Sequence, residues 1–151
     1  MPVIVHQVYI KASINRCFNF ARNLDIHTKT TAKTKEKAVG GVTRGLLVLS
    51  DVVTWEAVHF GIKQRLTAEI AEMDNPNKFV DVMVKGAFHS FTHKHSFREE
   101  NQGTLMTEEF NFQSPFGMMR TIAYTLFLEE YMRGFIISRA NELKKIAENR
   151  S

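Results

Sequence analysis

The sequence predicts an α+β fold in which helices cover one face of an antiparallel sheet. Between residues 46 and 113, apolar and polar residues alternate in short runs separated by turn-forming residues, as in strands joined by hairpins. Residues 118–149 contain one Gly and no Pro, and their apolar residues recur at helical spacing. A helix of that length needs a long apolar surface to lie on, and the sheet would provide it.

The first part of the chain predicts one strand followed by two short helices. Val3 to Lys11 is rich in β-branched and aromatic residues, which is typical of a strand. Ser13 is suited to cap a first helix and Asp25 a second. The Thr/Lys-rich stretch that follows predicts a weak strand at most. The glycines of residues 40–45 predict a loop, and their spacing is not that of a phosphate-binding loop.

Regular alternation then predicts a series of strands. The clearest run is Ile62 to Ile70, where every second residue is apolar. Asp74–Asn77 and Asn101–Gly103 are typical of turns between strands. The expected strands cover residues 53–57, 62–70, 79–85, 87–98 and 104–113. Short turns between consecutive strands imply an antiparallel meander.

The C-terminal segment predicts one long helix from Met118 to Asn149, after a break at Ser114–Gly117. Glu129 and Arg133 are spaced to pair on the surface of this helix. Its expected buried stripe consists of Ile122, Leu126, Met132, Ile136, Ala140, Leu143 and Ala147.

Composition limits the class of protein. A chain of 151 residues with 44% apolar content suits one domain spanning residues 1–151. Cys17 is the only cysteine, which excludes an intramolecular disulfide and favours a reducing compartment. Because there is neither a signal-peptide pattern nor an apolar run of membrane-spanning length, we expect a cytoplasmic protein.

The net charge of +4 is mild for a chain with 20 basic and 16 acidic residues. Basic residues gather at residues 29–37, where a solvated loop is the simplest interpretation and contact with phosphate or a membrane surface is the alternative. No Lys/Arg-rich helix with interleaved aromatics is present, so a nucleic-acid partner is not expected. We expect at most a transient membrane contact, and a homodimer is left open.

Histidines are concentrated on one predicted strand. Alternation places His89, His93 and His95 on the same face as Phe91 and Phe97. On the next strand one face carries Met106, Glu108, Phe110 and Phe112. A carboxylate and imidazoles inside an apolar wall are costly to bury unless they are hydrogen-bonded to one another.

Three interpretations of these residues remain open. The first is an interior His–Glu pair with a purely structural role. The second is a metal site, because His93, His95 and Glu99 have the His-x-His-x-x-x-Glu spacing of cupin ligands. The flanking glycines and the second half of the cupin motif are missing, so no metal or other cofactor is predicted. The third is a small-molecule pocket with an aromatic wall and a few polar groups.

Several motifs together resemble the SRPBCC superfamily, which includes START domains, birch-pollen-allergen-like proteins and polyketide cyclases. These motifs are Asp51–Gly61 (DVVTWEAVHFG), Phe79–Asp81, Gly86–Phe88, His93–Phe97 (HKHSF), Gly103–Thr104 and Ser114–Gly117 (SPFG). The resemblance implies a helix-grip fold, in which a seven-stranded curved antiparallel sheet surrounds a long C-terminal helix and encloses a cavity. Ala87 and Phe91 depart from the Pro and Trp that many relatives carry.

The resemblance implies binding or transport of a small hydrophobic or amphipathic ligand, such as a lipid, an isoprenoid or a polyketide-like compound. The alternative is an enzyme of the polyketide cyclase/dehydrase type, with His93 or His95 as general acid or base and Glu108 as its partner. A filled core without a cavity is a further alternative. The expected ligand-binding residues are Trp55, Leu66, Phe79, Met83, His89, Phe91, His93, His95, Met106, Glu108, Phe110, Phe112, Ile122 and Leu126.

Overall fold

The computed structural model describes residues 3–113 and 122–149, with side chains from residue 126 onward in the second range. Seven strands and three α-helices follow one another along the chain. Their bounds are β1 Val3–Ile10, α1 Ile14–Ala21, α2 Leu24–Thr30, the 3-10 helix η1 Ala32–Thr34, β2 Lys37–Gly41, β3 Val52–His59, β4 Ile62–Asp74, β5 Lys78–Lys85, β6 Ser90–Glu100, β7 Gly103–Gln113 and α3 Ile122–Glu148.

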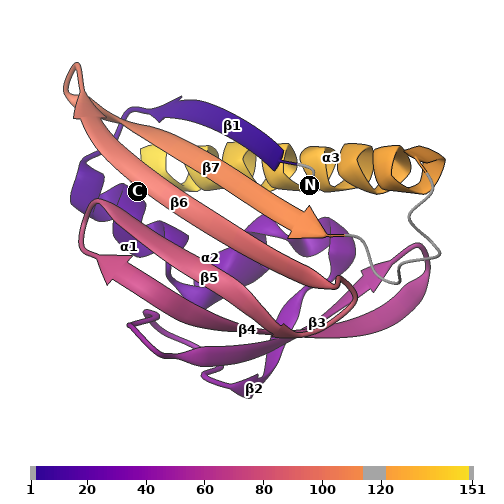
Figure 1. Ribbon diagram of the computed structural model, residues 1–151. Helices are drawn as coiled ribbons and strands as arrows, with labels where there is room; N and C mark the ends of the chain where they lie inside the picture. Colours follow the sequence, from indigo (N-terminus) through magenta and orange to yellow (C-terminus); the bar gives the residue numbers. More distant parts are fainter. Residues whose placement is uncertain (1–2, 114–121, 150–151) are drawn as a thin grey trace.

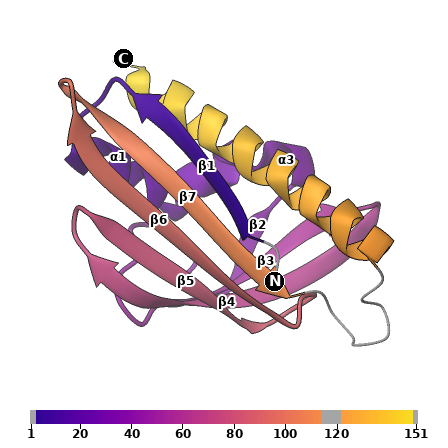
Figure 2. The same cartoon turned by 45° about the horizontal axis from the view of Figure 1, so that its top comes forward.

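The strands form one curved antiparallel sheet with the order β1-β7-β6-β5-β4-β3-β2. The long helix α3 runs alongside β1 and also contacts α1 and α2, with α1 near its C-terminal end (Figures 1 and 2). This arrangement confirms the predicted α+β helix-grip fold, with two short helices after the first strand.

Alternation correctly predicted which residues of β6 and β7 face inward. Phe91, His95 and Phe97 are buried on β6, whereas Thr92 and Arg98 are exposed. The predicted start of this strand was wrong, because β6 begins at Ser90. The backbone leaves the ladder before that residue, so the parity rule does not extend to the preceding loop.

The short helices agree with the sequence in one cap and differ in the other. Ser13 caps α1 and accepts a hydrogen bond from the backbone N–H of Arg16, as predicted. The cap of α2 is Asn23 rather than Asp25, because the Asn23 side chain accepts from the backbone N–H groups of Asp25 and Ile26. The Thr/Lys-rich stretch ends in the short edge strand β2.

The buried face of α3 follows the predicted stripe through Ile136, Ala140, Leu143 and Ala147. The prediction for Leu126 was wrong, because this side chain is 56% exposed and Leu128 is buried instead. These two leucines lie about 160° apart around the helix, on opposite edges of the stripe. Packing of α3 on the sheet selects the edge that holds Leu128.

Other expectations for the C-terminal segment have mixed outcomes. The helix is described from Ile122, so the expected start at Met118 and the break at Ser114–Gly117 lie outside the described residues. Glu129 and Arg133 form the predicted ion pair, at 2.9 Å. Within the described chain, no helix is both long enough and apolar enough to cross a membrane.

Two apolar clusters lie between the sheet and the helices. The first, called the α1 cluster, surrounds the inner face of α1; its principal members are Cys17, Phe18, Phe79, Phe97, Met106, Ala140 and Leu143. The second, called the cavity cluster, lies nearer the start of α3; it comprises Ile4, Ala68, Phe91, Phe110, Phe112, Leu128 and Ile136.

Candidate functional site

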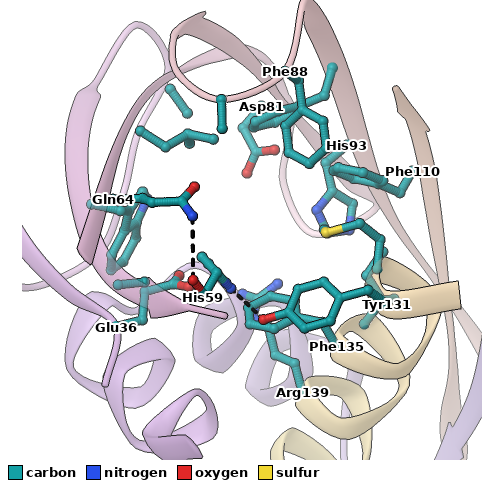
Figure 3. Close-up of a pocket in the computed structure, with 18 of the residues that line it drawn as sticks. Glu36, His59, Gln64, Asp81, Phe88, His93, Phe110, Tyr131, Phe135 and Arg139 are labelled. Atoms are coloured by element: carbon teal, nitrogen blue, oxygen red, sulfur yellow. Dashed lines mark hydrogen bonds between the residues drawn. The ribbon is translucent and has the colours of Figure 1, made fainter. Parts of the chain in front are cut away.

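A cavity of about 250 Å³ lies between the sheet and α3, beside the cavity cluster. Its wall is mostly apolar and aromatic, and Figure 3 shows side chains from the sheet and from α3 pointing into it. Principal wall residues are Trp55, Leu66, Phe88, Phe91, Phe110 and Phe135. An apolar hollow of this kind with a few convergent polar groups is the usual form of a small-molecule site.

One side of the cavity is polar. Its lining there consists of His27, Glu36, Asp81, His93, Glu108 and Arg139. His95 lies behind them with its side chain only 1% exposed and does not line the cavity. These seven residues are called the polar cluster. They come from α2, the η1–β2 connection, β5, β6, β7 and α3, so the whole fold is needed to bring them together.

Strand register explains the centre of the polar cluster. On β5 Asp81 is the register partner of His93, and on β7 Glu108 is the register partner of His95. The two histidine rings stack at 3.9 Å between centroids because they are two residues apart on one face of β6. One carboxylate therefore flanks the histidine pair on each side.

The distances within this centre are short. The His95 Nδ1 atom lies 2.6 Å from Glu108 Oε2, and His95 Nε2 lies 3.5 Å from Asp81 Oδ2. His93 Nε2 is 3.4 Å from the same Glu108 oxygen. Arg139 reaches Glu108 more loosely, with 4.0 Å between Nη1 and Oε1.

The close contacts between these histidines and carboxylates do not have hydrogen-bond geometry. Both ring nitrogens of His95, the Nε2 of His93, the Oε2 of Glu108 and the Nε of Arg139 are buried without a hydrogen-bond partner among the described residues. Buried polar atoms are usually partnered, so this group has unused bonding capacity next to the cavity.

The two histidines titrate differently. Burial alone would lower the pKa of His95, but the carboxylates of Glu108 and Asp81 outweigh it and raise the pKa to about 9. Burial lowers the pKa of His93, and the positive charge of His95 lowers it further. Burial would raise the pKa of Glu108, but the imidazoles of His95 and His93 hold it well below 4.5. At neutral pH, His95 and Glu108 are therefore charged and His93 is neutral.

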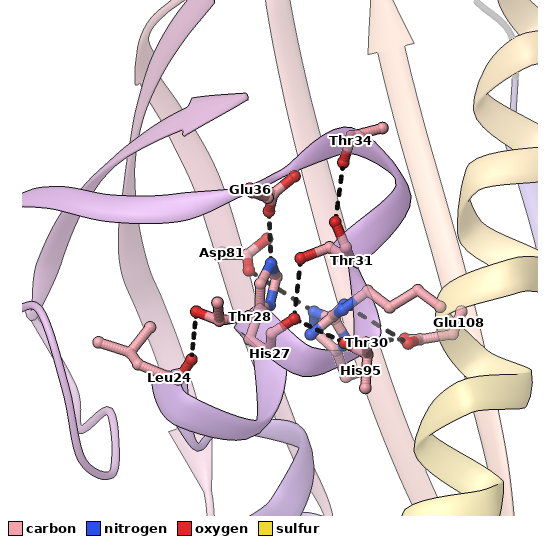
Figure 4. Close-up of polar contacts among 11 residues, drawn as sticks. Leu24, His27, Thr28, Thr30, Thr31, Thr34, Glu36, Asp81, His95 and Glu108 are labelled. Carbon is pink, nitrogen blue, oxygen red and sulfur yellow. Dashed lines mark hydrogen bonds and ion pairs between the residues drawn. The ribbon is translucent and has the colours of Figure 1, made fainter. Parts of the chain in front are cut away.

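A second polar pair joins the cluster from the helical side. The His27 Nε2 atom contacts a Glu36 carboxylate oxygen, and the imidazole stacks on Trp55 at 4.1 Å between ring centroids. Burial lowers the pKa of His27. Figure 4 draws this pair together with Asp81, His95 and Glu108. The stacking of His27 on Trp55 connects this pair to the cavity wall, because Trp55 lines the cavity.

The cavity reaches the surface near the β3–β4 turn. Phe60 lines the cavity and is 54% exposed, and its ring lies 4.4 Å from that of Tyr131 and 5.5 Å from that of Phe127, between centroids. His59 is hydrogen-bonded to the Tyr131 hydroxyl (Figure 3). Aromatic residues of β3, the β3–β4 turn and α3 therefore surround this opening.

The expected ligand-binding residues fall into three groups. Trp55, Leu66, Phe91, His93, Glu108 and Phe110 line the cavity. Phe79, Met106 and His95 are buried outside its lining, Phe112 is buried in the cavity cluster, and Met83 packs against that cluster. His89 and Leu126 are exposed, and the side chain of Ile122 lies outside the described part.

Glu99, the carboxylate of the alternative cupin-like metal site, lies apart from the histidines. It is exposed near the end of β6 and pairs in register with Thr104, away from the polar cluster. The spacing rule failed because the inward face near that end of β6 is filled by Phe97, which belongs to the α1 cluster.

Sequence reasoning missed several residues of the polar cluster. Asp81 lies two residues after Phe79 on a strand and therefore shares its inward face, a signal that was available. Arg139 follows Ile136 by three residues, so a charge on the apolar side of α3 was also visible. Nothing local predicts that His27 and Glu36 meet the sheet here, because their contacts depend on how α2 packs.

Comparison with known proteins identifies the fold. No known family model matches the sequence, and no curated protein matches it. Solved structures do match. The protein TTHA0849 from Thermus thermophilus has a TM-score of 0.79 at 19% identity, covering 95% of both chains. The major latex-like protein 151 from Panax ginseng has a TM-score of 0.69 at 15% identity, covering 98% of both chains.

A third similar structure, protein CV1439 from Chromobacterium violaceum, has a TM-score of 0.76 at 9% identity over 97% of each chain. At these identities the likeness concerns the fold and not the chemistry. The chain therefore has the helix-grip fold that its motifs predicted.

Proposed function

We propose that this protein binds a compact amphipathic molecule in the cavity, as a carrier or sensor of that molecule. The observation that supports this most strongly is the composition of the wall, which is mostly apolar with several aromatic side chains and is polar on one side. The apolar part of the ligand would pack on Phe88, Phe91 and Phe110. Its polar group would face His93 and Arg139, where buried atoms have unused hydrogen-bonding capacity.

The size of the cavity narrows the ligand class. About 250 Å³ lies just below the range of about 300–1,000 Å³ usual for drug-sized ligands. A small polyketide-like aromatic or a short isoprenoid therefore suits the space better than a long-chain lipid.

A cyclase/dehydrase-like enzyme is the second candidate, and one observation favours it. His93 lines the cavity and its lowered pKa keeps it neutral at pH 7, so it can accept a proton from a bound molecule. His95 is unsuited to that role, because it does not line the cavity and is already protonated. If the protein is an enzyme, His93 is the candidate base and His95 and Glu108 are positioning residues.

The first experiment is native mass spectrometry of freshly purified protein. A co-purifying molecule with an apolar body and one polar group supports the proposal, and its mass identifies the ligand class. An empty chain that also excludes environment-sensitive apolar dyes contradicts it.

A His93→Gln variant then separates the two functions, using the co-purified molecule as ligand. A carrier should lose about 1 kcal/mol of binding free energy, the value of about one hydrogen bond. An enzyme should keep its binding and lose roughly 10²–10⁴-fold in turnover. His89→Gln is the matched control, because His89 is exposed. Unchanged binding and turnover in His93→Gln would remove this histidine from the site.

A further inference from the structure

The centre of the polar cluster contains three side chains whose chemistry and position suit a metal ion. Asp81, His93 and His95 each offer one ligand atom, and these atoms lie within 4.8 Å of one another. Ligand atoms around a tetrahedral metal with bonds of about 2.0–2.2 Å are separated by about 3.4 Å. The 3.5 Å between His95 Nε2 and Asp81 Oδ2 already matches this separation.

We propose that Asp81, His93 and His95 form a mononuclear site for a divalent transition metal, with an open coordination position that faces the cavity. This proposal does not depend on the identity of any organic ligand. Two imidazoles and one carboxylate are a common ligand set for zinc and for non-haem iron. Asp81 and His93 line the cavity, so the remaining position of the metal would be accessible from there.

The strand geometry holds these ligands before any metal binds. His93 and His95 project from the same face of β6, and Asp81 projects from the adjacent strand opposite His93. His95 is fixed on its other side by Phe79, whose ring stacks on it at 4.3 Å between centroids. Sites built on strands keep their ligands in place better than sites built on loops.

The hydrogen bonding of the two histidines supports the metal site independently of the ligand distances. Both ring nitrogens of His95 and the Nε2 of His93 are buried without a hydrogen-bond partner among the described residues, although carboxylate oxygens lie 2.6–3.5 Å away. A metal ion would use the Nε2 of His95. Its Nδ1 would then donate to Glu108, the arrangement in which an outer carboxylate orients a ligating imidazole.

The fixed charges of the polar cluster favour a cation. Three carboxylates, those of Glu36, Asp81 and Glu108, face one guanidinium, that of Arg139. Metal binding would release to solvent the proton that His95 carries at neutral pH. With both imidazoles then neutral, these four groups carry a net charge of −2, which a divalent ion would neutralise. His27 also faces the cluster and is engaged with Glu36.

The test uses the full chain without a histidine tag, depleted of metal with a chelator and dialysed. Zn²⁺ binding is followed by calorimetry and Co²⁺ binding by visible absorption. One ion should bind per chain, and the Co²⁺ complex should show the strong absorption of a low-coordinate site. A folded wild-type chain that binds neither ion at one per chain overturns the proposal.

Variants locate the ion. Asp81→Asn and His93→Gln should each weaken binding by more than about 100-fold, and Glu108→Gln by about 10–100-fold, the usual effect of losing an outer-shell partner. Glu99→Gln and His89→Gln are matched controls that should bind like wild type, because both residues are exposed. Wild-type binding in Asp81→Asn, or a loss in Glu99→Gln, contradicts the assignment.

A measurement on the unmodified chain covers the case in which a variant does not fold. In the Co²⁺-loaded wild-type protein, two of the six histidines should show strongly shifted proton resonances, and His89 should not be one of them. Shifts on a single histidine, or on His89, overturn the proposal. Metal binding by a chain with an empty cavity would support this site and leave the proposed organic ligand contradicted.

Discussion

The two halves of the interior share one sheet and one helix but are packed differently. In the α1 cluster, Phe18 of α1 contacts Phe79 and Phe97 edge-on, with ring centroids 5.6 and 5.4 Å away. All three rings are at most 4% exposed. In the cavity cluster, Phe91 and Phe110 are also buried on the sheet, yet both line the cavity.

The difference comes from the position of α1. This helix covers one end of the sheet, contacts β6, β7 and α3, and inserts Cys17, Phe18 and Ala21 between them. At the other end, α3 is the only described helix that contributes side chains to the cavity cluster. The polar cluster lies where the two halves meet. His95 packs against Phe79 of the α1 cluster, and His93 lines the cavity. One half is therefore filled with apolar side chains, and the other retains the cavity.

The largest expected loss of stability comes from removing the ring of Phe18 from the α1 cluster. Phe18→Ala should lower the free energy of unfolding by about 3–5 kcal/mol, because the substitution leaves a void in a packed core. Phe88→Ala should cost clearly less, because Phe88 is half-buried and already borders the cavity. Urea unfolding of both variants measures the difference. Equal losses would mean that the two halves are packed alike.

An intermediate loss of stability is expected when a larger side chain is placed in the α1 cluster, compared with the same change at the cavity wall. Ala140→Leu, in the α1 cluster, should destabilise the protein by about 1–3 kcal/mol through overpacking. Ala57→Leu adds volume at the cavity wall and should cost much less, while reducing uptake of an apolar dye. Thermal melts and dye titration report the two effects. If Ala57→Leu is the more destabilising variant, the cavity is not free space.

The smallest expected effect comes from the cap of α1. Ser13→Ala should lower the free energy of unfolding by about 1 kcal/mol, because the backbone N–H of Arg16 loses its acceptor. Ser13→Asp is the control and should retain stability, since Asp is also a good N-cap. Dye binding in the cavity should not change in either variant. A change in dye binding would show that the two halves are coupled through α1.

Local sequence patterns predicted most of the fold. A period of two on β6 and β7 and a period near 3.6 on α3 depend only on which side of an element faces the core, so neighbouring residues reveal them. The inward positions of Phe91, His95 and Glu108 followed from that parity alone. The Ser13 cap was likewise a local feature.

What the local pattern could not decide was which inward residues meet, and where space remains. Leu126 and Leu128 lie on opposite edges of the stripe of α3, and only packing on the sheet buried Leu128.

The carboxylate beside the two histidines belongs to Asp81 and not to Glu99. Register across β5 and β6, and not spacing along one strand, brings these side chains together. By itself, the sequence determined an α+β chain with polar residues on an apolar face. The tertiary structure decided that these residues form one cluster beside a cavity, because such a cluster depends on the packing of elements far apart in the chain.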